Sequence, residues 1–329
     1  MSARVEIEAA AIFPYLVAGQ RQNAASAAFA ASLNPGAFMN FNLRAHRLMK
    51  ISLVSMLALL AASCGAVAAI PALRHFAIAL AHDPRDLPAL DTDTRVHFEQ
   101  GAEDCAREVA ARLPAAVARV EAAQGRPFAR DVPIGVYASM ESFGQANGAG
   151  TPRVAGVALP GRLTLSPVLC GAQKERMTAV LTHELSHAHL QGWLPPLVFA
   201  RLPNWFKEGL AVMVSGGGGA EGVSEMDAAA AIAKGDAIKV EDEGSLFHLT
   251  AVRFENPALR DTGDPVRRAR LAYRQAGMFV AWLRERDPNG FADFLQRVEN
   301  GEPFKLSFQA KFGRSPSEQW REFVSHLKG

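Results

Sequence analysis

Residues 177–191 have the sequence MTAVLTHELSHAHLQ, which contains the motif His183-Glu184-Leu185-Ser186-His187. Residues four apart lie on one face of a helix, so the imidazoles of His183 and His187 can reach one metal ion, with Glu184 beside them. A buried helix with three such polar groups is costly to desolvate unless a metal ion or other partners satisfy them. The pattern therefore favours a metal-binding helix over a solvated polar one. The same segment has an apolar stripe at helical spacing, formed by Met177, Val180, Leu181, Leu185 and Ala188.

A catalytic zinc site needs a third protein ligand and leaves one position for water. The metzincin pattern would require glycine and then histidine where Leu190 and Trp193 stand, so that class is excluded. His189 points away from the metal face, and we expect it to be a surface histidine or one with its own partner. Glu208, within PNWFKEGLA at Pro203–Ala211, lies on the next predicted helix. We expect Glu208 to be the third ligand, the alternative being a surface carboxylate.

The motif, followed by Trp205-Phe206-Lys207-Glu208-Gly209, resembles the gluzincin metallopeptidases of the MA clan. It is most similar to the small bacterial envelope proteins described as peptidase MA-like metallohydrolases. The resemblance extends over residues 132–327 and is looser in the C-terminal segments Tyr273–Leu283 and Phe308–Phe323.

This resemblance implies a zincin-like fold, in which a small N-terminal β-sheet precedes the active-site helix and a mostly helical C-terminal part follows. It also implies one Zn²⁺ ion as cofactor, Glu184 as the general base, and three zinc ligands, namely His183, His187 and Glu208. It does not imply a particular substrate.

The oxyanion formed during peptide hydrolysis needs a hydrogen-bond donor besides the metal, and two residues are candidates. Tyr273 opens a helix after the metal site, as a tyrosine does in related gluzincins; otherwise it is a core aromatic residue bonded to a backbone carbonyl. His248 is the second candidate, with a structural role as its alternative. Nearby, Gly216–Gly219 predicts either a lid or a plain flexible loop. Arg162–Ser166 predicts either the sheet edge, to which an extended substrate adds as a strand, or an internal strand.

Around this centre the sequence predicts one α+β domain, because strands are followed by helices. A mostly helical segment, Val96–Gln124, is expected to be interrupted at Pro114. Alternating or β-branched segments then predict strands at Val132–Ala138, Val154–Leu159 and Arg162–Leu165. The remaining predicted helices are Lys174–Leu190, Asn204–Val214, Ser224–Lys234, Val266–Arg286, Gly290–Glu299, Phe304–Phe312 and Ser317–Leu327.

The composition is that of a globular protein, with 49% hydrophobic and 21% charged residues among 329. A net charge of +2 lacks the strongly basic character of a nucleic-acid binder, so we expect no nucleic-acid partner. The sequence gives no indication of the oligomeric state.

The N-terminal part differs from the rest. Residues 1–50 sustain no apolar period, and we expect an unstructured or mis-assigned extension, with Met39 or Met49 as the true start. Ile51–Leu73 is uncharged, follows basic residues, and is long enough to cross a bilayer about 30 Å thick. It predicts an uncleaved transmembrane anchor or a signal segment, either a cleaved signal peptide or a lipoprotein signal ending at Cys64.

After this segment we expect a linker over residues 74–94 and a metallopeptidase domain over residues 95–329. Each reading of the N-terminal segment exports that domain, so we expect the cell envelope: either anchored in the inner membrane and facing the periplasm, or secreted to the periplasm. In an oxidising compartment Cys105 and Cys170 form a disulfide, the alternative being two buried thiols.

The function predicted from the sequence is an exported or membrane-anchored zinc metallopeptidase whose partner is a peptide or protein substrate. A second hypothesis is a non-catalytic binding or assembly protein on a zinc-binding peptidase fold. Glu184 argues against it, because a structural zinc site has no need of a base. A third hypothesis is a zinc amidase that acts on cell-wall material.

Overall fold

The structure is a computed structural model that describes residues 71–151, 153–244, 252–256 and 264–327. Its sheet has the strand order β1-β2-β3-β5-β4. Strands β2, β3 and β5 are parallel to one another, whereas β1 and β4 are antiparallel to their neighbours. Strand β4 therefore forms one edge of the sheet. The strands are β1 (Ala89–Leu90), β2 (Asp93–Phe98), β3 (Ile134–Val136), β4 (Gly156–Leu159) and β5 (Arg162–Leu165).

Four helices belong to the sheet-containing half: α3 (Pro71–Leu80), α4 (Glu103–Gln124), α5 (Met140–Ala146) and α6 (Met177–Trp193). Helix α4 connects the parallel strands β2 and β3 and packs against α6. Helix α6 follows the short 3₁₀ turns η2 (Pro167–Cys170) and η3 (Lys174–Arg176), and it also contacts β4 and β5. A further 3₁₀ turn, η1 (Pro84–Asp86), precedes β1.

The remaining described chain is helical, and its core is aromatic. Trp205 and Phe206 of α8 pack against Phe279 and Phe294, with ring centroids 5.2 Å and 5.4 Å apart, and both also contact Phe304. The helices are α7 (Pro196–Arg201), α8 (Asn204–Ser215), α9 (Glu225–Ala233), α10 (Pro265–Arg286), α11 (Pro288–Glu299), α12 (Phe304–Phe312) and α13 (Pro316–His326).

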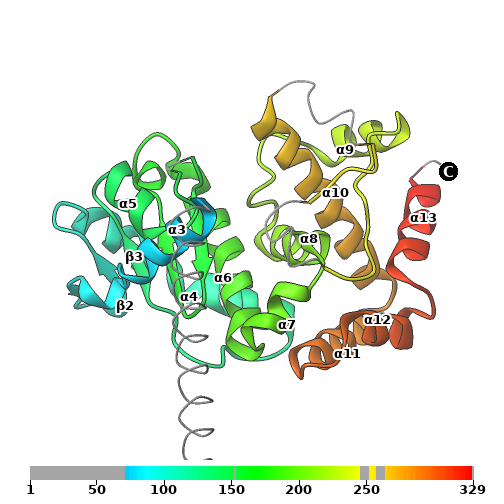
Figure 1. The fold of residues 1–329 in the computed structure, drawn as a ribbon, viewed down its shortest axis with the longest axis horizontal. Coiled ribbons are helices and arrows are strands. Elements are labelled where there is room, and N and C mark those ends of the chain that lie inside the picture. Colours follow the sequence, from blue (N-terminus) through cyan, green and yellow to red (C-terminus); the bar gives the residue numbers. More distant parts are fainter. Residues whose placement is uncertain (1–70, 152, 245–251, 257–263, 328–329) are drawn as a thin grey trace, which may run out of the picture. The chain divides into compact units, whose positions relative to one another are not determined.

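Helices α8 and α10 pack closely because glycine stands at their contact (Figure 1). A Cβ atom on Gly209 would lie 2.6 Å from the backbone oxygen of Ala276, and one on Gly277 would lie 2.5 Å from the side chain of Val212. Any larger residue at Gly209 would push α10 away from α8. Because Gly209 follows Glu208 directly, this approach also brings α10 next to that carboxylate.

The predicted α+β class is confirmed, and most helix positions agree with the prediction. The predicted strands at residues 154–159 and 162–165 form the β4–β5 hairpin. The prediction for Val96–Gln124 was wrong at two points: residues 93–98 form β2, and Pro114 lies inside a continuous α4. The alternative placing Arg162–Ser166 at the sheet edge is also wrong, because β5 lies between β3 and β4.

The predicted linker over residues 74–94 is folded. It contributes most of α3, the turn η1, strand β1 and the start of β2. Its polar, proline-containing composition resembles a tether, but Ala89 and Leu90 form β1, which pairs with β2 at the edge of the sheet. Arg162 is buried and bonds to this segment, donating to the carbonyl of Ala79 at 2.7 Å.

The transmembrane-helix prediction is corrected by the described residues, none of whose helices is both long and apolar enough to span a bilayer. Residues 51–70 of the predicted span, like the extension over residues 1–50, lie outside the described residues. The last three residues of the predicted span, Pro71–Leu73, lie in α3.

Cys105 at the start of α4 and Cys170 at the end of η2 form a disulfide, with their Cα atoms 5.4 Å apart. The sequence left open whether these two cysteines are bridged or are buried thiols. The bridge ties α4 to the turn η2, which η3 connects to α6.

Replacing both cysteines, as Cys105→Ser with Cys170→Ser, is expected to lower the free energy of unfolding by about 4 kcal/mol, because a bridge over 65 residues restricts the unfolded chain. Urea unfolding of the oxidised protein and of the double variant measures this difference. Mass spectrometry after alkylation without reductant is the control, and two alkylated cysteines would contradict the bridge.

Candidate metal centre

Helix α6 presents its two motif histidines on one face, as their spacing of four residues predicts. The Nε2 atoms of His183 and His187 lie 3.2 Å apart, with the ring centroids separated by 4.9 Å. Both side chains are mostly buried, with exposed fractions of 6% and 12%. Two imidazole nitrogens this close repel each other when neither carries a proton, so the pair needs a proton or a cation between them.

Glu208 of α8 completes the cluster, as the sequence predicted. Its Oε2 atom lies 3.3 Å from Nε2 of His183 and 3.5 Å from Nε2 of His187. Among the described residues, these three form a group whose potential ligand atoms all lie within 4.8 Å of one another. The two helices thus bring two imidazole nitrogens and one carboxylate oxygen to a single point.

The three separations fit a tetrahedral zinc ion. Bonds of about 2.0–2.1 Å at tetrahedral angles place the ligand atoms of zinc about 3.3 Å apart. The observed separations of 3.2, 3.3 and 3.5 Å match this geometry. Imidazole and carboxylate are also the donors that a catalytic zinc site combines, and three ligands leave the fourth position open.

The charges within the cluster are strongly coupled. Burial acts to raise the pKa of Glu208, but the two histidines outweigh it and hold that pKa far below its ordinary range. Burial acts to lower the pKa of His183, but Glu208 and Glu184 outweigh it and raise that pKa. A proton on His183 therefore balances the buried carboxylate, and a bound metal ion would replace that proton.

The orientation of His183 is set by the glycine segment after α8. Nδ1 of His183 donates to the carbonyl of Gly218 at 2.8 Å, which leaves Nε2 as the ring nitrogen that faces Glu208. The N–H of Gly218 in turn donates to the Ser215 hydroxyl at 2.9 Å. Sequence reasoning offered a lid or a flexible loop for Gly216–Gly219, and its contact with His183 was missed.

Glycine is required in this segment because there is no room for a side chain. A Cβ atom on Gly218 would lie 2.4 Å from the backbone oxygen of Ala179 in α6, and one on Gly219 would lie 3.0 Å from the ring of His183. Gly219 also has a φ of 81°, which disfavours other residues. The run of four glycines was visible in the sequence, but we did not interpret it as a place where the backbone approaches α6 closely.

Glu184 lies beside the cluster without belonging to it. Its Oε2 atom accepts a hydrogen bond of 2.9 Å from the backbone N–H of Ala158 on the edge strand β4. Burial raises the pKa of the Glu184 carboxyl above its ordinary value, although the neighbouring histidines oppose that shift. A raised pKa makes the carboxylate a stronger proton acceptor than an exposed glutamate.

Tyr273 of α10 packs on the same site. Its ring stacks on His183 with a centroid distance of 6.3 Å and an interplanar angle of 17°. Its hydroxyl lies close to Glu208, and burial together with the carboxylates of Glu208 and Glu184 raises the pKa of Tyr273. The phenol therefore stays protonated and can donate. Both interpretations of Tyr273, an oxyanion donor or a core aromatic residue, stay predictions; His248 lies outside the described residues.

His189 has partners of its own, as expected. It is fully buried, and Nε2 donates to the carbonyl of Arg126 at 3.0 Å. On its other side, Nδ1 lies 3.4 Å from Oε1 of the buried Glu299 in α11, which also pairs with the Arg126 guanidinium at 3.2 Å. His189 thus joins α6 to α11 and plays no part in the cluster; the surface alternative was wrong.

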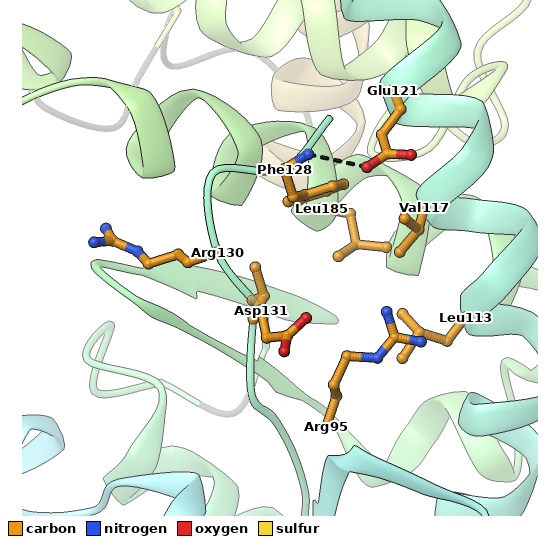
Figure 2. Close-up of a pocket in the computed structure, with 9 residues that line it drawn as sticks. Arg95, Leu113, Val117, Glu121, Phe128, Arg130, Asp131 and Leu185 are labelled. Atoms are coloured by element: carbon orange, nitrogen blue, oxygen red, sulfur yellow. Dashed lines mark hydrogen bonds between the residues drawn. The ribbon is translucent and has the colours of Figure 1, made fainter. Parts of the chain in front are cut away.

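A cavity of about 350 Å³ lies on the other side of α6 (Figure 2). Leu185, which faces away from the two histidines, lines it together with Leu113 and Val117 of α4. Residues 128–132 of the loop after α4 form the opposite wall. The cavity shares no lining residue with the histidine–glutamate cluster, so it is separate from the candidate centre.

No protein-family model, no curated protein and no solved structure matches this chain. Function must therefore be inferred from the chemistry of the site.

Gly218→Ala is expected to weaken zinc binding by about 10–100-fold, because the added Cβ displaces the carbonyl that orients His183. Titration of the metal-free protein with a zinc indicator measures the affinity. Gly144→Ala in α5, where a Cβ meets nothing within 4 Å, is the matched control and should bind zinc normally. An unchanged affinity in Gly218→Ala would contradict the orienting role of the loop.

Proposed function

We propose that the protein is a zinc-dependent metallopeptidase of the gluzincin type, with a zincin-like fold. The observation that carries this proposal is the convergence of His183, His187 and Glu208 at separations of 3.2–3.5 Å, with a non-ligating Glu184 beside them. A structural zinc site needs neither an open fourth position nor a neighbouring carboxylate free to accept a proton. This combination favours an enzyme over a binding or assembly protein.

The reaction proposed is hydrolysis of a peptide bond by water. A Zn²⁺ ion held by His183, His187 and Glu208 would polarise the scissile carbonyl and make the attacking water more acidic. Glu184 takes the proton from that water and delivers it to the leaving amine. The raised pKa of Glu184, caused mainly by burial, suits a group that must do both.

Tyr273 is proposed as the donor to the developing oxyanion. Burial and the two carboxylates raise its pKa, so the phenol remains protonated throughout the working pH range. Its hydroxyl is held at Glu208, next to the metal position, and can turn to a substrate oxygen bound there. Its ring, stacked on His183, fixes the direction of approach.

We also propose that the domain works in an oxidising compartment outside the cytoplasm. The Cys105–Cys170 disulfide supports this, because such bridges persist in secreted and envelope proteins and are rare in proteins of reducing compartments.

Two substitutions separate the proposed base from the proposed ligands. Glu184→Gln keeps the shape but cannot take a proton, so it should hold close to one zinc per chain and lose nearly all hydrolysis. Glu208→Ala removes the anionic ligand and should bind zinc much more weakly, as should His183→Ala and His187→Ala. Metal analysis after dialysis, paired with a peptide-library digest, measures both properties.

Glu225→Ala and Asp227→Ala are the controls, because both carboxylates are exposed on α9. Zinc loss in either control with zinc retained in Glu208→Ala would disprove the ligand set. Full activity of Glu184→Gln would disprove the hydrolytic mechanism. Digestion of cell-wall fragments alongside the peptides distinguishes a peptidase from an amidase of the same chemistry.

Tyr273→Phe is expected to lower kcat by about 10²–10³-fold with zinc content unchanged, because the oxyanion loses a donor. Steady-state kinetics on the best peptide from the digest, together with metal analysis, checks this. A loss of only a few-fold would leave Tyr273 as a packing residue against His183.

A further inference from the structure

The outward face of the edge strand β4 is held by α6. The carbonyl of Ala155 accepts a hydrogen bond of 2.9 Å from the N–H of Ser166. Val157 and Leu159, two and four residues later, therefore direct their backbone groups toward β5 as well. Gly156 and Ala158 alternate with those residues, so their backbone N–H and C=O groups point away from β5, toward the open edge of the sheet. At a free sheet edge these groups are normally left to solvent or to an added strand.

Both backbone groups of Ala158 are instead bonded to side chains of α6. Its N–H donates to Oε2 of Glu184 at 2.9 Å, and its carbonyl accepts from Nε2 of Gln191 at 3.1 Å. Gln191 lies seven residues after Glu184, which is two turns along the same helix face. A carbonyl only accepts, so the amide nitrogen of Gln191 must face it.

Gly156 makes the approach of Glu184 possible. A Cβ atom there would lie 2.8 Å from Cγ of Glu184 and 3.2 Å from the side chain of Val180. The strand therefore leaves space for the carboxylate at one residue and holds it by an N–H two residues later. Ala188, small and buried between Glu184 and Gln191 on α6, lets strand and helix stay close.

We propose that Gln191 is a positioning residue: with Glu184 it clamps the backbone of Ala158 to α6, so that the Ala158 N–H fixes the carboxylate of the base. The part of this inference that concerns catalysis rests on the proposed peptidase function. Without the amide of Gln191, the carbonyl of Ala158 loses its hydrogen bond. The N–H of the same residue then loses its alignment with Glu184. A displacement of the base by about 1 Å can cost as much as 10²-fold in rate.

The clamp itself is tested by backbone amide exchange in the full-length, metal-free protein, followed by NMR. The Ala158 amide should be protected although it lies on the sheet edge, and Gln191→Met should make it exchange about tenfold faster or more. The Val157 amide, which faces β5, should not change. Glu184→Ala should also release the Ala158 amide, because it removes the acceptor.

Arg130→Ala is the matched control variant. Arg130 donates to the backbone carbonyl of Gln191 at 3.3 Å and does not contact Ala158, so this change leaves the clamp intact. A second variant, Gln191→Glu, keeps the size of the side chain but sets a carboxylate against the Ala158 carbonyl, and it should release the Ala158 amide at least as much as Gln191→Met.

The effect on catalysis is tested on the zinc-loaded protein. Gln191→Met should lower kcat by about tenfold or more while KM and the zinc content stay within twofold, and Arg130→Ala should change none of them.

Faster exchange throughout α6 and β4 would overturn the positioning role in favour of a general structural one, as would faster Ala158 exchange with an unchanged kcat. An unprotected Ala158 amide in the wild-type protein would overturn the clamp. Absence of zinc-dependent hydrolysis in the wild-type protein would instead overturn the proposed function and with it the catalytic part of this inference, while the amide exchange would still decide whether the clamp exists.

Discussion

The burial of the Glu208 carboxylate against His183 and His187 is the interaction on which the arrangement of the helices depends. A carboxylate in such a place is costly unless cationic or hydrogen-bonding groups surround it. Here the two imidazoles, the Tyr273 hydroxyl and the close contact of α8 with α10 act together. Gly209 is what allows α10 to approach, because any side chain there would strike the Ala276 carbonyl. The residue next to the carboxylate thus matters as much as the carboxylate itself.

Helix α6 connects the two kinds of structure in this domain. One face meets α8 at the cluster, another meets the edge strand through Glu184 and Gln191, and a third faces the cavity beside α4. At its C-terminal end His189 is bonded to Arg126 and Glu299, which ties the helix to α11. A helix fixed on so many sides has little freedom to tilt, so the geometry of its polar side chains is set largely before any metal binds.

The sequence predicted the cluster well because its geometry is mostly local. A spacing of four residues on a helix brings His183 and His187 together, and Glu208 follows after one short connection. The helical periodicity of the C-terminal half was equally readable, since amphipathic segments with clear caps leave few alternatives. The α+β class followed from the order of those segments.

The predictions that failed have a common cause: the structure of those regions depends on backbone hydrogen bonds and on pairing between segments distant in the sequence. Residues 74–94 look like a tether, yet Arg162, far along the chain, donates to the carbonyl of Ala79 within that segment. The strand at residues 162–165 has no feature in its own sequence that distinguishes an edge from an interior position. Gly218 and Ala158 act through a carbonyl and an N–H, and no side-chain pattern reveals such contacts.

The disulfide gives the domain a particular covalent topology. Cys105 and Cys170 enclose strands β3, β4 and β5 in one closed ring of chain, whereas α6 and every later helix lie outside it. A single peptide-bond break in the loop after α5, for example at residues 147–151, would open the ring without dividing the molecule. The edge strand that holds Glu184 would then be joined covalently to α4 only through the disulfide. On a denaturing gel, a nicked chain would therefore run as one band until the disulfide is reduced.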